Sequence, residues 1–308
     1  MIKTVTLNPA LDKTLVIERF AADKVNRALA SRVDAGGKGI NVSKALAILG
    51  AKSLAFGIAA GDTGDYILGY LAERGIETRF ARGSGRTRTN LKIVDPVGKT
   101  HTDINEAGPR VDAATLAELE DSLFADASPE DIYVFSGSAP EGCPPDIYAR
   151  WIQSAGRAGA RSVLDADGEL LARGARAEPE LMKPNERELE RLAGRSLPDD
   201  ASRVAAVREL LGGKSIVAVS LGAEGALFVD SRRAIRAAGI CVEAASTVGA
   251  GDTMLAALVL CMERGLGLEE MVGPAVAAGA AAVEAGGSAA FTPAAVKARL
   301  REVRYADI

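Results

Sequence analysis

Residues 246–253 of the 308-residue sequence read STVGAGDT and combine glycines with a carboxylate. Glycines at the start of a helix expose backbone N–H groups, which can hold an oxyanion at the positive end of the helix dipole. We expect such an anion-binding turn at Gly249, Ala250 and Gly251. Asp252 follows directly, and a carboxylate there could accept the proton of an attacking alcohol. The pattern favours phosphoryl transfer to a hydroxyl group over the alternative that Asp252 only caps a helix.

A second glycine-rich segment, DAGGKGIN, occupies residues 34–41. Gly37 allows a ligand to approach the backbone closely, Lys38 adds a positive charge, and Asn41 can hydrogen-bond to hydroxyl groups. A simple turn between a strand and a helix needs fewer of these features. We therefore expect a substrate-binding site here. It is not a Walker A phosphate loop, because the GxxxxGK[ST] pattern is absent.

Two further segments are candidates for a functional site, and one of them is suited to a metal ion. Residues 183–188 read KPNERE, in which Pro184 can open a helix and Asn185 and Glu188 share a helical face. Oxygen atoms of these two side chains could hold a hydrated Mg²⁺, or they could simply cap the helix. Residues 219–225 read VSLGAEG and predict a glycine turn between two strands.

The elements that must position these residues alternate between strand and helix. Strand-like apolar runs lie at 2–7, 54–59, 132–135, 162–165, 181–182, 216–220 and 226–229. Helical patterns lie at 41–49, 66–74, 145–155, 186–192 and 253–264. This alternation predicts an α/β fold with a mostly parallel central sheet and helices on both faces. Ligands of such sheets bind beyond the carboxyl ends of the strands.

Residues 13–33 and 88–105 interrupt that alternation, since apolar and polar residues alternate there without a helical pattern. We expect them to form a small β-sheet that covers one edge of the main sheet as a lid. There is no linker of the Ser/Pro type and no repeat. The prediction is one domain spanning 1–308, with the lid inserted into it.

The overall composition excludes several classes of protein. Hydrophobic residues make up 48% and charged residues 25%, as in ordinary globular proteins. With 37 basic and 41 acidic residues the net charge is −4, so no nucleic-acid partner is expected. No apolar run is long enough for a membrane span, and the N-terminus does not read as a signal peptide. Three scattered cysteines and one histidine favour neither zinc nor disulfides, and we expect a cytoplasmic protein.

Taken together, the four segments resemble the ribokinase/PfkB family of carbohydrate kinases. GGKGIN at 36–41 is similar to the family's N-terminal signature, and VGAGD at 248–252 to its C-terminal signature. KPN at 183–185 and SLG at 220–222 stand in the matching order between them. The likeness spans nearly the whole chain. It implies the ribokinase-like fold with a β-sheet lid, and in many members that lid also forms the interface of a homodimer.

Within the family, the chain is most similar to the branch of 1-phosphofructokinases and tagatose-6-phosphate kinases. The segments that carry this closer likeness are TLNPALD at 6–12, RTRTNLK at 86–92, TDINEAGP at 102–109 and SGS at 136–138. Enzymes of this branch transfer the γ-phosphoryl group of ATP to a hydroxyl of a ketohexose phosphate, with Mg²⁺. Fructose 1-phosphate is the expected acceptor here, and tagatose 6-phosphate and fructose 6-phosphate remain open alternatives.

The resemblance also implies roles for single residues. The first-strand Asp12 would bind sugar hydroxyls, with the other substrate contacts at Gly37, Lys38, Asn41, Arg88 and Asn90, the last two at the phosphate end. Asp252 would be the catalytic base beside the turn at 249–251. The nucleotide side would comprise Lys183, Asn185, Ser220, Gly222 and Gly225, and Asn185 and Glu188 would serve Mg²⁺, in part through water.

A substrate that already carries a phosphate needs additional positive charge beside an anionic nucleotide. Arg27, Lys38 and Arg88 are available on the lid side, and bidentate Arg–phosphate contacts are among the stronger hydrogen bonds. Lys92 is also available, but solvated surface is the better interpretation for it. Two alternatives stay open: a kinase for an unphosphorylated sugar or nucleoside, which Arg88 argues against, and a non-catalytic sugar-phosphate-binding regulator, which would have no need of Asp252.

Overall fold

The computed structural model describes residues 1–211, 215–244, 246–287 and 289–308. Within these ranges, ten strands form a central sheet in the order β14-β13-β12-β11-β10-β9-β8-β1-β4-β5. Its strands are β1 (Ile2–Thr6), β4 (Ser53–Ala59), β5 (Glu77–Arg82), β8 (Ile132–Ser136), β9 (Arg161–Asp165), β10 (Leu181–Met182), β11 (Ile216–Ser220), β12 (Gly225–Val229), β13 (Ala234–Ala238) and β14 (Tyr305–Asp307). The run from β11 to β5 is parallel, and β12 to β14 continue it as antiparallel strands.

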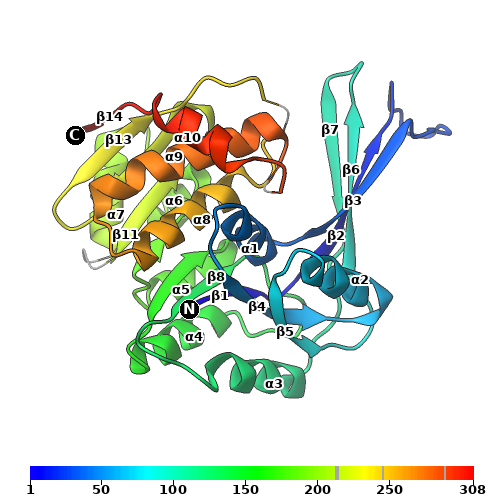
Figure 1. The fold of residues 1–308 in the computed structure, drawn as a ribbon, viewed down its shortest axis with the longest axis horizontal. Coiled ribbons are helices and arrows are strands. Elements are labelled where there is room, and N and C mark those ends of the chain that lie inside the picture. The colour runs from blue at the N-terminus through cyan, green and yellow to red at the C-terminus, as the bar shows by residue number, and fades with distance from the viewer. Residues whose placement is uncertain (212–214, 245, 288) are drawn as a thin grey trace.

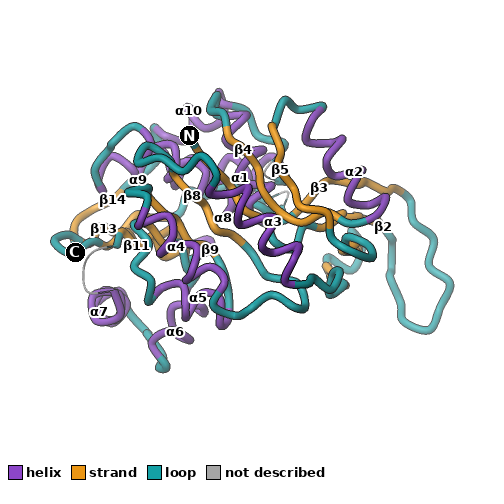
Figure 2. The backbone as a smooth tube through the Cα atoms, turned by 90° about the horizontal axis from the view of Figure 1, so that it is seen from below, coloured by secondary structure: helices purple, strands orange, loops and turns teal. Residues whose placement is uncertain are grey.

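Helices cover both faces of this sheet (Figure 2). The helices are α1 (Lys38–Ile48), α2 (Gly61–Ala72), α3 (Ala113–Phe124), α4 (Ile147–Arg157), α5 (Gly168–Ala175), α6 (Glu186–Ala193), α7 (Asp200–Leu211), α8 (Ala250–Glu263), α9 (Leu268–Ala285) and α10 (Pro293–Leu300). One apolar core packs α3 to α7 against one face, around the buried rings of Phe135, Tyr148 and Trp151. The other core packs α1, α8 and α9 against the opposite face. The predicted α/β class is confirmed.

A second, smaller sheet stands away from the main body (Figure 1). Among the described residues it has four strands, in the order β3-β2-β6-β7: β2 (Ala10–Val16), β3 (Ala30–Gly36), β6 (Arg88–Asp95) and β7 (Thr100–Asn105). β2 pairs with β3 antiparallel and with β6 parallel. A small sheet separate from the main one was predicted from the two stretches without helical periodicity.

The bounds of this sheet correct the sequence interpretation. The first stretch, expected at 13–33, begins inside β2 and ends inside β3, because β2 already starts at Ala10 and β3 runs to Gly36. Asp12 therefore lies on β2 of the small sheet and not on the first strand of the molecule. The resemblance implied a first-strand position for Asp12, but the chain turns between Thr6, where β1 ends, and Ala10, where β2 begins.

The structure also differs from the sequence prediction in the residues at which helices begin. α1 begins at Lys38 and α8 at Ala250, where helices were predicted from residues 41 and 253, because glycine-rich sequence disfavours helix and was taken for loop. Gly39 inside α1 has a packing reason: a Cβ there would stand 2.6 Å from the Val5 backbone oxygen on β1. Likewise Pro184 does not open α6. Asn185 is the residue that caps it.

Several elements were not predicted, namely β5, β13, β14, α3, α5, α7, α9 and α10. The alanine-rich sequence at 274–283 belongs to α9, which packs on α8 inside the second core. None of the helices in the described part of the chain is long and apolar enough to cross a membrane.

Candidate active site

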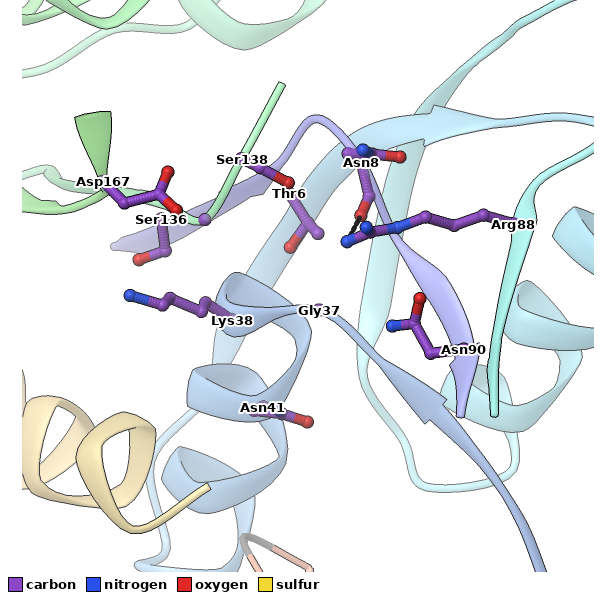
Figure 3. Close-up of a pocket in the computed structure, with 11 residues that line it drawn as sticks. Thr6, Asn8, Gly37, Lys38, Asn41, Arg88, Asn90, Ser136, Ser138 and Asp167 are labelled. Atoms are coloured by element: carbon purple, nitrogen blue, oxygen red, sulfur yellow. Dashed lines mark hydrogen bonds between the residues drawn. The ribbon is translucent and has the colours of Figure 1, made fainter. Parts of the chain in front are cut away.

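A pocket of about 240 Å³ lies where the carboxyl ends of β1 and β8 meet the small sheet and the start of α1 (Figure 3). Its lining residues are Thr6, Asn8, Gly37, Lys38, Asn41, Arg88, Asn90, Ser136, Gly137, Ser138 and Asp167. The predicted substrate residues of the GGKGIN segment and of β6 thus come together at this edge. This is the position in which parallel sheets bind ligands.

The pocket walls contain polar atoms that lack partners. Five buried side-chain atoms of its lining have no hydrogen-bond partner among the described residues: Thr6 Oγ1, Asn8 Oδ1, Arg88 Nε, Asn90 Oδ1 and Ser136 Oγ. A buried polar group without a partner is unfavourable by about 1–3 kcal/mol. Their concentration in one pocket indicates a ligand with many hydroxyl or phosphate oxygens, which would satisfy them.

Arg88 and Asn90 reach the pocket from β6 and are held in place by short contacts. The Arg88 guanidinium donates to the backbone oxygen of Asn8 at 3.1 Å, and Figure 3 shows it directed from the small sheet toward Asn8. Asn90 Nδ2 donates to Asp12 Oδ1 at 2.9 Å. Asp12 thus stands behind Asn90 and does not itself line the pocket. Burial raises the pKa of the Asp12 carboxyl, against the opposing effects of Asn90, Lys44 and Arg88.

Arg27 is not brought to the pocket. It is exposed on the loop between β2 and β3, far along the small sheet from the residues that line the pocket. Lys92 matches its expected place on the surface side, where it pairs with Asp103 at 3.6 Å.

The segment at 249–252 forms the start of α8. Gly249 precedes the helix with φ +78°, a left-handed conformation that glycine adopts without strain. Asp252 is buried in the first turn, and its Oδ2 accepts a hydrogen bond of 2.8 Å from Asn41 Nδ2 on α1. Gly249 is the cap residue, and no side-chain hydrogen bond caps the helix. The side chain of Asp252 therefore does not cap α8; it accepts the hydrogen bond from Asn41 instead.

The electrostatic surroundings of Asp252 differ from the ordinary carboxylate expected from sequence. Burial, together with the negative charge of Asp165, raises its pKa, and the Asn41 hydrogen bond, Lys183 and Lys38 only partly oppose the shift. A carboxylate with a raised pKa is a stronger base than a free one, so the shift suits proton acceptance from an alcohol.

Asp165 is a site residue that sequence reasoning missed. It is the last residue of β9 and is fully buried, with Lys38 Nζ 2.8 Å from its Oδ1 and Lys183 Nζ 3.2 Å from its Oδ2. Burial alone would raise the pKa of the Asp165 carboxyl, but Lys183 and Lys38 hold it below its usual range. Burial also opposes the charge of Lys38, yet Asp165 raises the pKa of that lysine above its usual value. A signal was available, since Asp165 ends a predicted strand at the ligand-binding edge.

These charges converge on the anion-binding turn. Lys183 Nζ lies 3.3 Å from the point where a Cβ of residue 251 would stand, so the ammonium group approaches the backbone at Gly251 closely. Asn41 on α1 holds Asp252 from the other side. Backbone N–H groups, two lysines and a buried base therefore meet between α1 and α8, next to the pocket.

The predicted nucleotide side continues along the same sheet edge. Lys183 follows β10, Ser220 ends β11, and the backbones of Asn185 and Ser220 form a parallel bridge. The predicted turn between β11 and β12 is confirmed: Gly222 has φ +60° and Gly225 φ +104°. A Cβ at Gly225 would stand 2.3 Å from the Ala237 oxygen, so only glycine fits there.

The Asn185–Glu188 pair forms a capping box on α6. Asn185 Oδ1 accepts from the Glu188 backbone N–H at 2.9 Å, and Glu188 Oε2 accepts from the Asn185 N–H at 2.7 Å. No group of three or more His, Cys, Asp or Glu side chains is placed to bind a metal in the part of the chain that the structure describes. Glu188 keeps its second carboxylate oxygen free of the capping box. This donor set fits a Mg²⁺ that takes most of its oxygens from water and nucleotide phosphates.

The site combines a glycine-rich helix start, a buried carboxylate and a polar pocket, an arrangement that suits phosphoryl transfer to an alcohol. The comparisons with known proteins agree. The sequence pattern of the pfkB family carbohydrate kinases matches residues 5–295. The chain belongs to the PfkB family of carbohydrate kinases.

Individual relatives are similar over most of their length. A 1-phosphofructokinase of Rhodobacter capsulatus is 40% identical over 87% of this chain and 86% of its own. The ATP-dependent 6-phosphofructokinase isozyme 2 of Escherichia coli is 35% identical over 91% of this chain and 92% of its own. Among solved structures, phosphofructokinase-2 from Escherichia coli in complex with substrates and products has a TM-score of 0.92 and 32% identity over 98% of both chains. The ribokinase-like fold and the phosphotransferase class are thereby established.

Proposed function

We propose that this kinase transfers the γ-phosphoryl group of ATP to a hydroxyl of a ketohexose phosphate, with fructose 1-phosphate as the acceptor and fructose 1,6-bisphosphate as the product. The observation that carries the proposal is the set of unpartnered polar atoms around one pocket, which includes Nε of Arg88. Arg88 would bind the acceptor's phosphate, and Thr6, Asn8 and Asn90 would bind its hydroxyls. Asn90 was expected at the phosphate end, but its Nδ2 donates to Asp12 and only its oxygen is unpartnered, so it suits a hydroxyl donor. The similarity to a 1-phosphofructokinase points to the same acceptor.

In the proposed mechanism, Asp252 accepts the proton of the attacking hydroxyl as the bond to phosphorus forms. The N–H groups at 249–251, with Lys183 and Lys38, stabilise the charge that develops on the transferred group. ATP would lie along the turn at 222–225 and the ends of β10 and β11. When bound near Glu188 and Asn185, Mg²⁺ would neutralise charge on the nucleotide phosphates.

A comparison of acceptors tests this proposal. We expect ADP release to show the highest kcat/KM with fructose 1-phosphate, measured beside fructose 6-phosphate, tagatose 6-phosphate and free fructose. Fructose 6-phosphate is the second candidate, because the similar Escherichia coli isozyme is named a 6-phosphofructokinase. A higher kcat/KM for fructose 6-phosphate would replace the proposed acceptor, and activity confined to free sugars would refute a phosphosugar site.

Replacing Arg88 with Ala should raise the KM for the phosphosugar by about one to two orders of magnitude, because a lost charge-assisted hydrogen bond is worth about 1.5–3 kcal/mol. The KM for ATP should stay nearly unchanged, since the expected nucleotide side lies elsewhere on the sheet edge. Steady-state kinetics with each substrate varied in turn measure both. Lys92→Ala is the matched control, a cation on the same strand that pairs with Asp103 outside the pocket. An unchanged phosphosugar KM in Arg88→Ala would show that the phosphate is bound elsewhere.

We further propose that the small sheet acts as a lid, inserted into a single domain that spans 1–308. Arg88 and Asn90 belong to this sheet, so a bound phosphosugar would connect it to α1 on the main body. Amide hydrogen exchange should therefore slow in β2, β3, β6 and β7 when fructose 1-phosphate is added. Helix α3, which is remote from the pocket, serves as the internal reference. Exchange that is unaltered in the four strands would indicate a rigid open site.

The same sheet is our proposed interface of a homodimer. Exposed apolar side chains gather on it and on its loops: Val25, Leu29, Val97 and Ile104. Their burial against a second copy would be favourable.

For location, we propose the cytoplasm. The three cysteines are free, which fits a reducing compartment.

A further inference from the structure

Lys44 on α1 is a buried lysine that the proposed reaction does not use. Its side chain is nearly inaccessible, and its Nζ donates a hydrogen bond of 2.7 Å to the backbone oxygen of Ala35 on β3. The ammonium group also lies 5.9 Å from the centre of the Tyr70 ring. Among the described residues, no carboxylate forms an ion pair with it. An ammonium group has three donors, so this one is poorly compensated for its loss of water.

Charged groups face Lys44 from every side of the site. They are Asp12 on β2, Asp34 on β3, Arg74 just after α2, and Asp252 on α8, and the neutral but titratable Tyr70 on α2 faces the ammonium group with its ring. Burial lowers the pKa of Lys44 to about 8, which the three carboxylates partly oppose and Arg74 reinforces. Lys44 is therefore charged at neutral pH and titrates in the mildly alkaline range.

The position of this charge is unfavourable for folding. A lysine has a pKa of about 10.4 in an unfolded chain, so the unfolded state holds the proton more tightly than the folded one, and the two states differ in bound protons between about pH 8 and 10.4. The penalty is complete below pH 8 and disappears as the pH rises toward 10.4. Natural proteins retain destabilising groups more often at functional sites than elsewhere. Lys44 is such a group, and it lies beside the proposed substrate pocket.

Lys44 acts on Asp12 in two ways. Its charge lowers the pKa of the Asp12 carboxyl, against the burial that raises it. Its hydrogen bond also fixes the backbone on which Asp12 packs, since a Cβ at Gly36 would stand 1.9 Å from Asp12 Oδ2. Asp12 in turn holds Asn90, which lines the pocket.

We propose that Lys44 is a positioning residue for the acceptor site: its ammonium group anchors strand β3 at Ala35 and thereby holds Asp12 in place behind Asn90. Asn90 is then held with its amide N–H directed to Asp12 and its oxygen directed into the pocket, where it can accept a hydrogen bond from an acceptor hydroxyl. The inference rests on the proposed function, because it assumes that the pocket binds the phosphosugar.

The test uses Lys44→Gln, which keeps a donor for the Ala35 oxygen but removes the charge. We expect the KM for fructose 1-phosphate to rise about tenfold, the equivalent of about 1.4 kcal/mol of acceptor binding. The KM for ATP should stay unchanged, and the melting temperature at pH 7 should not fall, because a buried charge is removed. Lys3→Met is the control for loss of a buried lysine. Lys3 pairs with Asp126 and Asp131 at the opposite sheet edge, so this change should lower the melting temperature and spare the phosphosugar KM.

A pH profile separates positioning from general packing. In the wild type the phosphosugar KM should rise above about pH 8, as Lys44 loses its proton. In Lys44→Gln that rise should vanish, and the acid limb of the phosphosugar KM should move to higher pH because Asp12 protonates more readily. The substrate phosphate titrates equally in both proteins. Lys44→Arg, which retains the charge, should keep the wild-type acid limb, and it replaces Lys44→Gln as the informative variant if the latter fails to fold.

An unchanged phosphosugar KM and pH profile in Lys44→Gln would overturn the inference. So would equal rises of both KM values with a lower melting temperature, since that combination indicates a structural role alone. If the wild type phosphorylates no hexose phosphate, the proposed function fails instead, and the two failures are thereby distinguished.

Discussion

Asp252→Asn is expected to lower kcat by about two to four orders of magnitude, which is the usual contribution of a general base. An amide cannot take the hydroxyl proton, yet it has nearly the size of the carboxylate. Its oxygen can still accept the hydrogen bond that Asn41 Nδ2 donates to Asp252 at 2.8 Å. The KM for ATP should therefore change little. Single-turnover phosphoryl transfer, measured beside equilibrium binding of ATP, distinguishes a loss of chemistry from a loss of binding.

The stability of this variant follows from the direction of the pKa shift. Burial raises the pKa of Asp252 in the folded protein, so its charge disfavours folding above that pKa. The neutral Asn should thus leave the melting temperature at pH 7 unchanged or higher. The raised pKa also places the acid limb of kcat nearer to neutrality than for an ordinary carboxylate. Asp62→Asn, in the exposed first turn of α2, is the matched control. Near-wild-type kcat in Asp252→Asn, or a large fall in its melting temperature, would contradict the assignment of the base.

The central architecture could be predicted because strand-length apolar runs alternate with helical periods. Buried strands such as β4 and β8 are mostly apolar, and a parallel sheet covered on both faces needs that composition. The residues at which helices begin were harder to predict from the sequence. In α1 and α8 the first turn consists of glycine-rich sequence, which local propensity assigns to loop. What makes those turns helical is tertiary contact, such as the close approach of Gly39 to β1.

The candidate site likewise contains residues that could be predicted from the sequence and residues that could not. Motif residues such as Lys38, Asn41 and Arg88 were predicted, since their chemistry is visible in short segments. Asp165 was not, because its one signal, a place at the end of a predicted strand, is not accompanied by a local motif. Its role arises only when β9 brings it between Lys38 and Lys183, which are far apart in the sequence.

The second large expected effect is a loss of stability when Asp165 is replaced. Asp165→Asn should reduce the free energy of unfolding at pH 7 by about 3–5 kcal/mol, because removal of one member of a buried ion pair leaves its partners uncompensated. Here the partners are Lys183, which is nearly inaccessible, and Lys38, which is partly exposed. Activity should fall as well, since both ammonium groups would lose the carboxylate that directs them toward the anion-binding turn. Urea unfolding at several pH values measures the first effect.

The pH dependence provides an independent check on that result. The two lysines hold the pKa of Asp165 below its unfolded value of about 3.9. Its contribution to stability is therefore complete above that value and is lost as the pH falls through the folded pKa. The stability difference between wild type and Asp165→Asn should be constant near pH 7 and should shrink only in strong acid. Asp103→Asn, which removes an exposed partner of Lys92, should change stability by less than about 1 kcal/mol. If Asp165→Asn were as stable as that control variant, Lys38 and Lys183 would not depend on Asp165, and another group would have to hold their charge beside Gly251.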